Sequence, residues 1–92
     1  MALLIKTNGT KKEVKPASGK SFTLDEVYAL MGCSMVEPVR LRDGRMMLVD
    51  EEGKLKRPQV ENTTANALAF GIIAFDDVIV GDVLIVTDEE FD

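Results

Sequence analysis

The chain has 92 residues, of which 46% are apolar and 29% are charged, and its formal net charge is −5 at pH 7. This length predicts a single domain over residues 1–92, with a thin core. No apolar run approaches the roughly 18 residues of a membrane span. The first residues also lack the basic and apolar stretches of a secretory signal, so we expect no membrane association.

Residue types exclude several chemistries. The chain has no histidine, which removes the commonest general base and the commonest metal ligand. Its single cysteine, Cys33, cannot form an internal disulfide and is expected to be a small buried apolar residue. No glycine-rich phosphate loop is present. We therefore expect no metal and no cofactor, and a cytoplasmic location, because one free thiol fits a reducing compartment.

The negative charge is concentrated late in the sequence. Residues 76–92 contain seven acids and no base, whereas the rest of the chain contains eleven bases and nine acids. Residues 87–92 predict an acidic, frayed end. The alternative is an acidic surface that competes with nucleic acid for a basic partner. Phosphate repulsion argues against a nucleic acid polymer as the ligand.

The first elements are a short hairpin and a helix. Residues 2–6 form an apolar strand, and residues 10–15 return as a polar edge strand or as an irregular loop. Residues 21–32 have five helix signals, which include a capping box at Thr23 and Glu26. Gly32 suits the left-handed end of this helix. The expected buried face repeats at helical spacing and consists of Leu24, Val27, Tyr28 and Met31.

The dipeptide Asp43-Gly44 lies between two alternating runs, residues 35–42 and 45–51, and is typical of a two-residue hairpin loop. Such a loop makes Arg42 face Arg45 and makes Glu37 face Asp50. It also separates an aliphatic face of the hairpin from an arginine face. Because Pro38 cannot donate to a ladder, the first strand is expected at an edge of the sheet or to begin pairing after this residue.

The remaining elements are a second helix and a last strand. Asn62 or Thr63 can begin a helix that runs to about Phe70. Residues 83–86 form a continuous run rich in β-branched residues, which predicts a strand buried on both faces. The predicted fold is α+β, with a small, mainly antiparallel sheet and two helices packed on one face of it.

Two groups of residues are candidate ligand-binding residues. The first is Arg40, Arg42 and Arg45, whose planar guanidinium groups bind phosphate in two places at once; Lys54, Lys56 and Arg57 follow soon after. The second group lies at the start of the second helix, where free N–H groups can bind an anion. It consists of Asn62, Thr63, Thr64 and Asn66. A solvated sheet face and ordinary helix capping are the alternatives for the two groups.

Glu37 and Asp50 form a third candidate site. Like charges that face each other on a sheet are destabilising unless the sheet end is exposed, a helix or a basic residue compensates them, or a cation lies between them. The pair is therefore a possible cation site or acid–base pair. Simple exposure at the sheet end is the alternative.

The order of these pieces resembles a small family of unknown function found in bacteriophages and mobile elements. The resemblance covers residues 22–86 and includes the helix that ends near Gly32, the Asp43-Gly44 hairpin and the run Met47-Leu48-Val49-Asp50-Glu51-Glu52-Gly53-Lys54. Asn62 and the stretch Asp77-Val78-Ile79-Val80-Gly81-Asp82-Val83 complete it. Pro38 and the acidic end depart from the family pattern. The resemblance implies a phage-type setting, in which short accessory proteins often counter host defence, and it implies no activity.

We expect a non-enzymatic accessory protein that forms a homo-oligomer. The leading hypothesis is sequestration of a small anionic ligand, such as a signalling nucleotide, in the host cytoplasm. The second is an inhibitor that binds a host protein through the acidic surface over residues 76–92, as a nucleic-acid mimic does. The third is a metal-assisted hydrolase built on Glu37 and Asp50.

Overall fold

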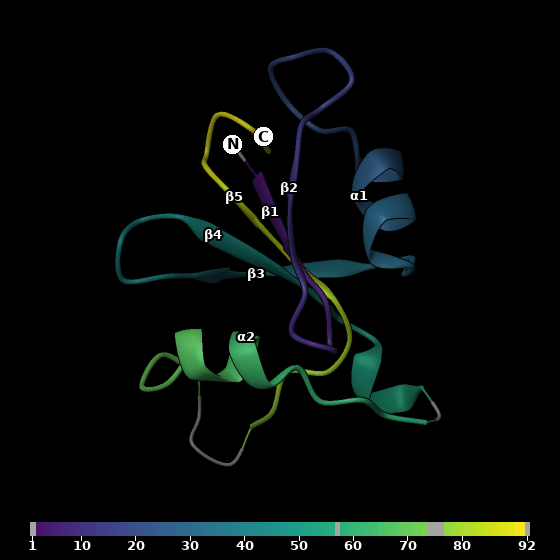
Figure 1. The fold of residues 1–92 in the computed structure, drawn as a ribbon, viewed down its shortest axis with the longest axis vertical. Coiled ribbons are helices and arrows are strands. Elements are labelled where there is room, and N and C mark those ends of the chain that lie inside the picture. Colours follow the sequence, from purple (N-terminus) through teal and green to yellow (C-terminus); the bar gives the residue numbers. More distant parts are fainter. Residues whose placement is uncertain (1, 57, 74–76, 92) are drawn as a thin grey trace.

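Five strands form one antiparallel sheet in the order β2-β1-β5-β4-β3 (Figure 1). The computed structural model describes residues 2–56, 58–73 and 77–91. The strands are β1 (Ala2–Ile5), β2 (Lys11–Val14), β3 (Val36–Arg40), β4 (Met46–Asp50) and β5 (Val83–Val86). All four residues of β5 are buried, which confirms the expectation for this run. β5 lies between β1 and β4, so the last strand of the sequence is the central strand of the sheet.

The two helices pack on opposite faces of the sheet, α1 (Leu24–Met31) on one face and α2 (Thr63–Leu68) on the other. Val27 and Met31 of α1 pack in one hydrophobic cluster with the even-numbered residues of the central strands. Ala65 of α2, with Ala69, packs in the other cluster with the odd-numbered residues. The expectation of both helices on one face is wrong. The α+β class and the antiparallel sheet are confirmed.

Helix α1 begins and ends where the sequence predicts. The Thr23 side chain accepts a hydrogen bond from Glu26 N at 3.1 Å, and Thr23 N donates to Glu26 Oε1 at 2.9 Å, so both halves of the capping box are present. Gly32 ends the helix with φ 67°. On the predicted buried face, Val27 and Met31 are buried and Tyr28 is half-buried, whereas Leu24 is 50% exposed.

The hairpin between β3 and β4 has a three-residue loop, one residue longer than predicted. Leu41 N donates to Arg45 O at 2.8 Å, so residues 42–44 form the loop. Gly44 occupies the third position of this loop, where a left-handed residue is needed, and adopts φ 92°. The strand register therefore shifts by one residue, and Glu37 faces Val49 instead of Asp50. The predicted pairing of Glu37 with Asp50 and of Arg42 with Arg45 is wrong.

β3 is an edge strand, as Pro38 predicts. Two hydrogen bonds close the ends of the hairpin, from Leu41 N to Arg45 O and from Glu51 N to Met35 O. They show that the backbone N–H and C=O groups of the odd-numbered residues of β3 point toward β4. Pro38 is even-numbered, so its nitrogen lies on the outer side of the strand. No ladder hydrogen bond is lost at this proline.

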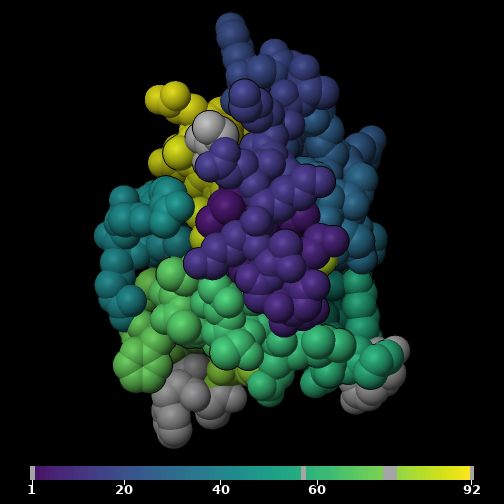
Figure 2. Space-filling view, viewed as in Figure 1, coloured from purple at the N-terminus to yellow at the C-terminus, as the bar shows by residue number. Residues whose placement is uncertain are grey.

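The predicted frayed end is folded against the sheet over its described residues. Phe22 N donates to Glu90 O at 2.6 Å. Thr87 N donates to Glu90 Oε1 at 2.9 Å, and Phe91 packs beside the cluster on the α1 face. Figure 2 shows the β1–β2 hairpin across one face of the molecule, with the 15–20 loop projecting at one end and the segments around α2 at the opposite end. The expectation of fraying is wrong for residues 87–91, and Asp92 lies outside the described residues.

Candidate functional site

The three arginines of the hairpin do not converge on one position. Arg40 Nη1 contacts Asp88 Oδ1 at 2.7 Å, and Arg45 Nε contacts Asp43 Oδ2 at 2.8 Å. Arg42 instead donates to the carbonyl of Phe70, just after α2 on the other face of the sheet. Each guanidinium group thus has its own acidic or carbonyl partner. The prediction that the three arginines share one face of the hairpin is therefore wrong. Arg57, which was expected to extend this face, lies outside the described residues.

The start of α2 is occupied by its own side chains. Asn62 is fully buried, and its Oδ1 accepts a hydrogen bond from Ala65 N at 3.0 Å. Its Nδ2 donates to the carbonyls of Ile5 at 3.0 Å and Gly81 at 2.9 Å. Asn62 therefore caps the helix and ties it to β1 and to the residues before β5. Thr63 is exposed, Thr64 is half-buried, and α2 has only six residues.

Asn66 performs a similar role one turn later. Its Nδ2 donates to Ile79 O at 2.9 Å, and its Oδ1 accepts from Ile79 N at 2.9 Å, as a neighbouring strand would. Asn62 N also donates to Ile79 O at 3.0 Å. The two asparagines thus fix the position of Ile79. They are structural residues, and Ile79, which they hold in place, lines the pocket described next.

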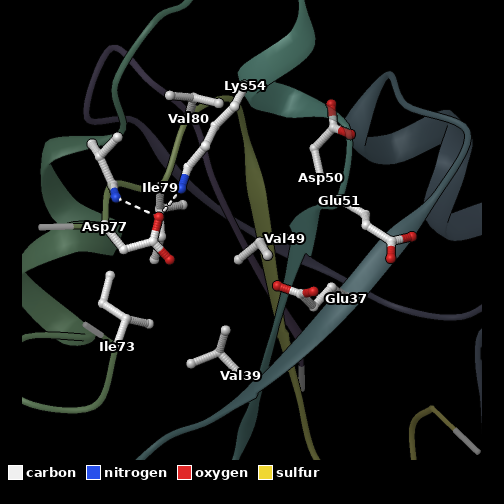
Figure 3. Close-up of a pocket in the computed structure, with 11 residues that line it drawn as sticks. Glu37, Val39, Val49, Asp50, Glu51, Lys54, Ile73, Asp77, Ile79 and Val80 are labelled. Atoms are coloured by element: carbon white, nitrogen blue, oxygen red, sulfur yellow. Dashed lines mark hydrogen bonds and ion pairs between the residues drawn. The ribbon is translucent and has the colours of Figure 1, made fainter.

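A pocket of about 120 Å³ lies between the end of the β3–β4 hairpin and residues 77–80 (Figure 3). Its floor is apolar. The floor residues come from both strands of the hairpin, from the chain after α2 and from the segment before β5: Val39, Val49, Ile73, Ile79 and Val80. Four of them, all but Val80, belong to the hydrophobic cluster beneath α2 or pack against it. Val39 and Val49 do so because the shifted register places both on this face of the sheet.

Charged side chains surround this floor. In Figure 3 the Glu37 carboxylate points over Val49 toward the pocket, and the Asp77 carboxylate lies on the opposite side. Lys54 reaches across to Asp77, and its ammonium group forms an ion pair with Asp77 Oδ1. The same oxygen accepts a hydrogen bond from Val78 N at 2.9 Å. Glu37 makes no hydrogen bond or ion pair with any described residue, so its carboxylate is available to a ligand.

Asp50 and Glu51 also line the pocket, but their carboxylates point away from its centre in Figure 3. The Asp50 side chain is 8% exposed, and its Oδ2 contacts Lys56 Nζ at 2.6 Å. This hydrogen bond raises the pKa of Lys56. Asp50 Oδ1 accepts from Glu52 N at 3.0 Å. Asp50 is thus a structural anchor for the chain after β4, although it lies in the same pocket as Glu37.

The turn that carries Lys54 is held close to the pocket by Gly53, in the 3₁₀ helix η1 (Gly53–Leu55). Gly53 is buried, and a Cβ atom at this position would lie 2.5 Å from Val80 Cγ2. Only glycine allows so close an approach of this turn to residue 80. The contact places Lys54 beside the 77–80 segment.

Nothing in the described part of the chain groups three or more residues that could hold a metal ion. Cys33 is half-buried, and burial, with the nearby charge of Asp50, raises the pKa of its thiol. A raised pKa makes a thiol less reactive. Within the described ranges, no helix is long and apolar enough to cross a membrane.

Sequence reasoning identified Glu37 and Asp50 but missed Lys54 and Asp77 as parts of one site. The pair is separated by 23 positions, and its meeting depends on the path of the chain through α2. The sequence signal that could have indicated this contact is Gly53, because a glycine in a turn often marks a place where another segment of the chain comes close. The carboxylates of Glu37 and Asp77 across an apolar floor suit a positively charged group on an aliphatic chain.

The family model described as "Domain of unknown function (DUF3846)" matches residues 1–92. No curated protein and no solved structure matches the chain significantly.

Proposed function

The chain belongs to the DUF3846 family of domains of unknown function, and from the geometry of its pocket we propose that it is a non-enzymatic protein-binding module. It binds a lysine or arginine side chain that projects from the surface of a partner protein. The observation that carries this proposal is the pocket in which Glu37 and Asp77 lie on opposite sides of an apolar floor.

The pocket has the size of one side chain. Its volume of about 120 Å³ is well below the roughly 300–1,000 Å³ of pockets that enclose small-molecule ligands. The methylene groups of lysine or arginine pack on valine and isoleucine, while the charged end meets a carboxylate. Glu37 supplies a carboxylate that no described residue occupies.

Exposed apolar residues near the pocket in the sequence support a protein partner. Leu55 follows Lys54 directly and is 79% exposed, and Phe70 lies three residues before Ile73 and is 77% exposed. A partner that inserts a basic side chain can bury such residues at the same time. A free amino acid or a metal ion would leave them in water.

The resemblance to phage proteins supplies a setting for this proposal. The partner would be a host protein with a basic surface, met in the host cytoplasm, and the module would inhibit it as a counter-defence factor. This proposal keeps the acidic-surface hypothesis but places it on a different surface, because the acids over the described residues 77–91 do not form one patch. Asp77 borders the pocket, whereas Asp88 contacts Arg40 beside the hairpin loop. Homo-oligomer formation remains part of the proposal.

Sequestration of a small anionic ligand is less well supported by the geometry. An anion bound by Arg40 and Arg45 would have to displace Asp88 and Asp43. Asn62 and Asn66 already use their amide groups within the fold. Hydrolysis by a Glu37–Asp50 pair is less well supported for a similar reason, because Asp50 is bound to Lys56.

The test is a titration of the full chain with short peptides, followed by NMR of the valine and isoleucine methyl groups. The probes are a capped pentapeptide with one central lysine, the same peptide with arginine, and the same peptide with uncharged norleucine. We expect the two basic peptides to shift the methyl signals of Val39, Val49 and Ile79, and the norleucine peptide to leave them in place. The Glu37→Gln variant should weaken the binding by about threefold to fivefold, as for an exposed charge pair.

Glu51→Gln is the matched control. It removes the same charge from the lining of the same pocket, but its carboxylate points away from the centre. We expect less than about a twofold change in this variant. Equal shifts with the norleucine peptide, or equal losses in the two variants, would contradict the proposal. Methyl shifts that appear instead with cyclic or linear nucleotides would favour the anion hypothesis.

A further inference from the structure

Lys54 already places an ammonium group in the pocket to which we assign a basic ligand. We propose that Lys54 is a tethered occupant of the cation position, and that a lysine of the partner, attracted by the carboxylates of both Glu37 and Asp77, binds by replacing the Lys54 ammonium group on Asp77. This inference rests on the proposed function and adds its regulation, because the position beside Asp77 is then occupied by the protein's own Lys54 side chain until the partner arrives.

The geometry of the ion pair allows this exchange. Lys54 Nζ contacts Asp77 Oδ1 on the side of the pocket opposite Glu37 (Figure 3). The Lys54 and Asp77 side chains are 55% and 40% exposed, so water reaches both partners. An exposed pair of this kind is only weakly stabilising and exchanges readily.

The backbone of Lys54 does not need to move during the exchange. Gly53 holds the turn against Val80, and Leu55 N donates to Glu52 O at 3.0 Å. Only the flexible side chain of Lys54 leaves its place. Asp77 keeps its hydrogen bond from Val78 N, so its carboxylate stays oriented for the incoming ammonium group.

The exchange has a direct cost for affinity. A partner's lysine must compete with an ammonium group that is tethered a few bonds away and therefore present at a high effective concentration. Removing the Lys54 charge should therefore strengthen binding of a lysine peptide. A charge removed far from the pocket should have little effect at physiological salt.

The experiment compares Lys54→Met with the unaltered chain, using the central-lysine pentapeptide as the probe. Methionine keeps an apolar chain of similar length and lacks the charge. Lys20→Met is the matched control, because Lys20 is an exposed lysine of the 15–20 loop and does not line this pocket. A second readout follows the Cε–Hε signals of Lys54 during the titration, with Asp77→Asn as the reference for a released Lys54.

We expect Lys54→Met to bind the peptide about threefold to tenfold more tightly, and Lys20→Met to change the affinity by less than about twofold. We also expect the Lys54 signals to move toward their positions in Asp77→Asn as the peptide saturates the pocket.

Two other outcomes overturn it and can be told apart. If the peptide shifts the pocket methyl signals while the Lys54 signals stay in place and the two variants bind alike, the exchange is wrong and the proposed function stands. If no pocket signal moves in the unaltered chain or in Lys54→Met, the proposed function fails together with the exchange.

Discussion

At the scale of single residues, Asn62 and Asn66 show that one sequence signal is compatible with two different roles. A polar cluster at a helix start is compatible with capping and with anion binding. The burial of Asn62, and the acceptors it finds at Ile5 and Gly81, decide for capping. These acceptors lie 57 and 19 positions away, so no local pattern could have revealed them. Glu37 was identifiable from the sequence, because an acid stands out among the aliphatic residues of the predicted inner face of the hairpin.

Asn62→Ala should be among the most destabilising substitutions in the chain. It leaves the buried carbonyl group of Ile5, the partly buried carbonyl group of Gly81 and the buried amide of Ala65 without this partner. We expect a loss of about 2–4 kcal/mol in the free energy of unfolding, measured by urea denaturation. Thr63→Ala, at the exposed neighbouring position, should cost less than about 0.5 kcal/mol. Equal losses in the two variants would show that the buried amide has no special role.

At the scale of elements, local signals predicted α1 correctly and the hairpin register incorrectly. The capping box, the buried Val27 and the left-handed Gly32 all act within one helix, so the sequence contains everything needed. The Asp43-Gly44 dipeptide fits two-residue and three-residue loops alike. The longer loop forms because Asp43 Oδ1 accepts a hydrogen bond from Arg45 N at 3.0 Å, which places Leu41 opposite Arg45. A shift of one residue moved every side chain of one strand relative to the other.

The capping box of α1 also predicts a dependence of stability on pH. Hydrogen bonds from the backbone amides of Thr23 and Ala17 lower the pKa of Glu26 below its ordinary value of 4.5. The folded chain therefore binds this proton less readily than the unfolded chain, so the contribution is present above pH 4.5 and is lost as the pH falls through the lowered pKa. We expect Glu26→Gln to lose less of its stability than the unaltered chain between about pH 5 and pH 2. Thermal unfolding at several pH values measures this, and parallel curves for the two proteins would contradict it.

At the scale of the whole molecule, the sequence predicted the class of the fold but not the arrangement of its layers. The continuous apolar runs of β1, β4 and β5 alternate between two faces, and a sheet that is apolar on both faces needs a cover on each. That signal was present and favours helices on opposite sides. The strand order was not predictable, because it depends on contacts between the first and last strands, about 80 positions apart.

The described end of the chain belongs to the fold and is not a detachable acidic tail. Deleting residues 88–92 removes the hydrogen bond from Phe22 N to Glu90 O and the packing of Phe91. We expect this deletion to cost about 1–3 kcal/mol, measured by urea denaturation. The double variant Asp88→Asn and Glu89→Gln removes charge at exposed positions, so it should change stability by less than about 0.5 kcal/mol. A deletion as mild as the double variant would contradict this account.

The central place of β5 has a consequence for synthesis in the cell. While the ribosome is still making residues 83–86, β1 and β4 have no neighbour on their inner edges, and the sheet remains in two separate hairpins. Such open edges and uncovered apolar faces are prone to aggregation. The nascent polypeptide can therefore complete its sheet only after residues 83–86 have been made, and its two hairpins are open to wrong pairing until then.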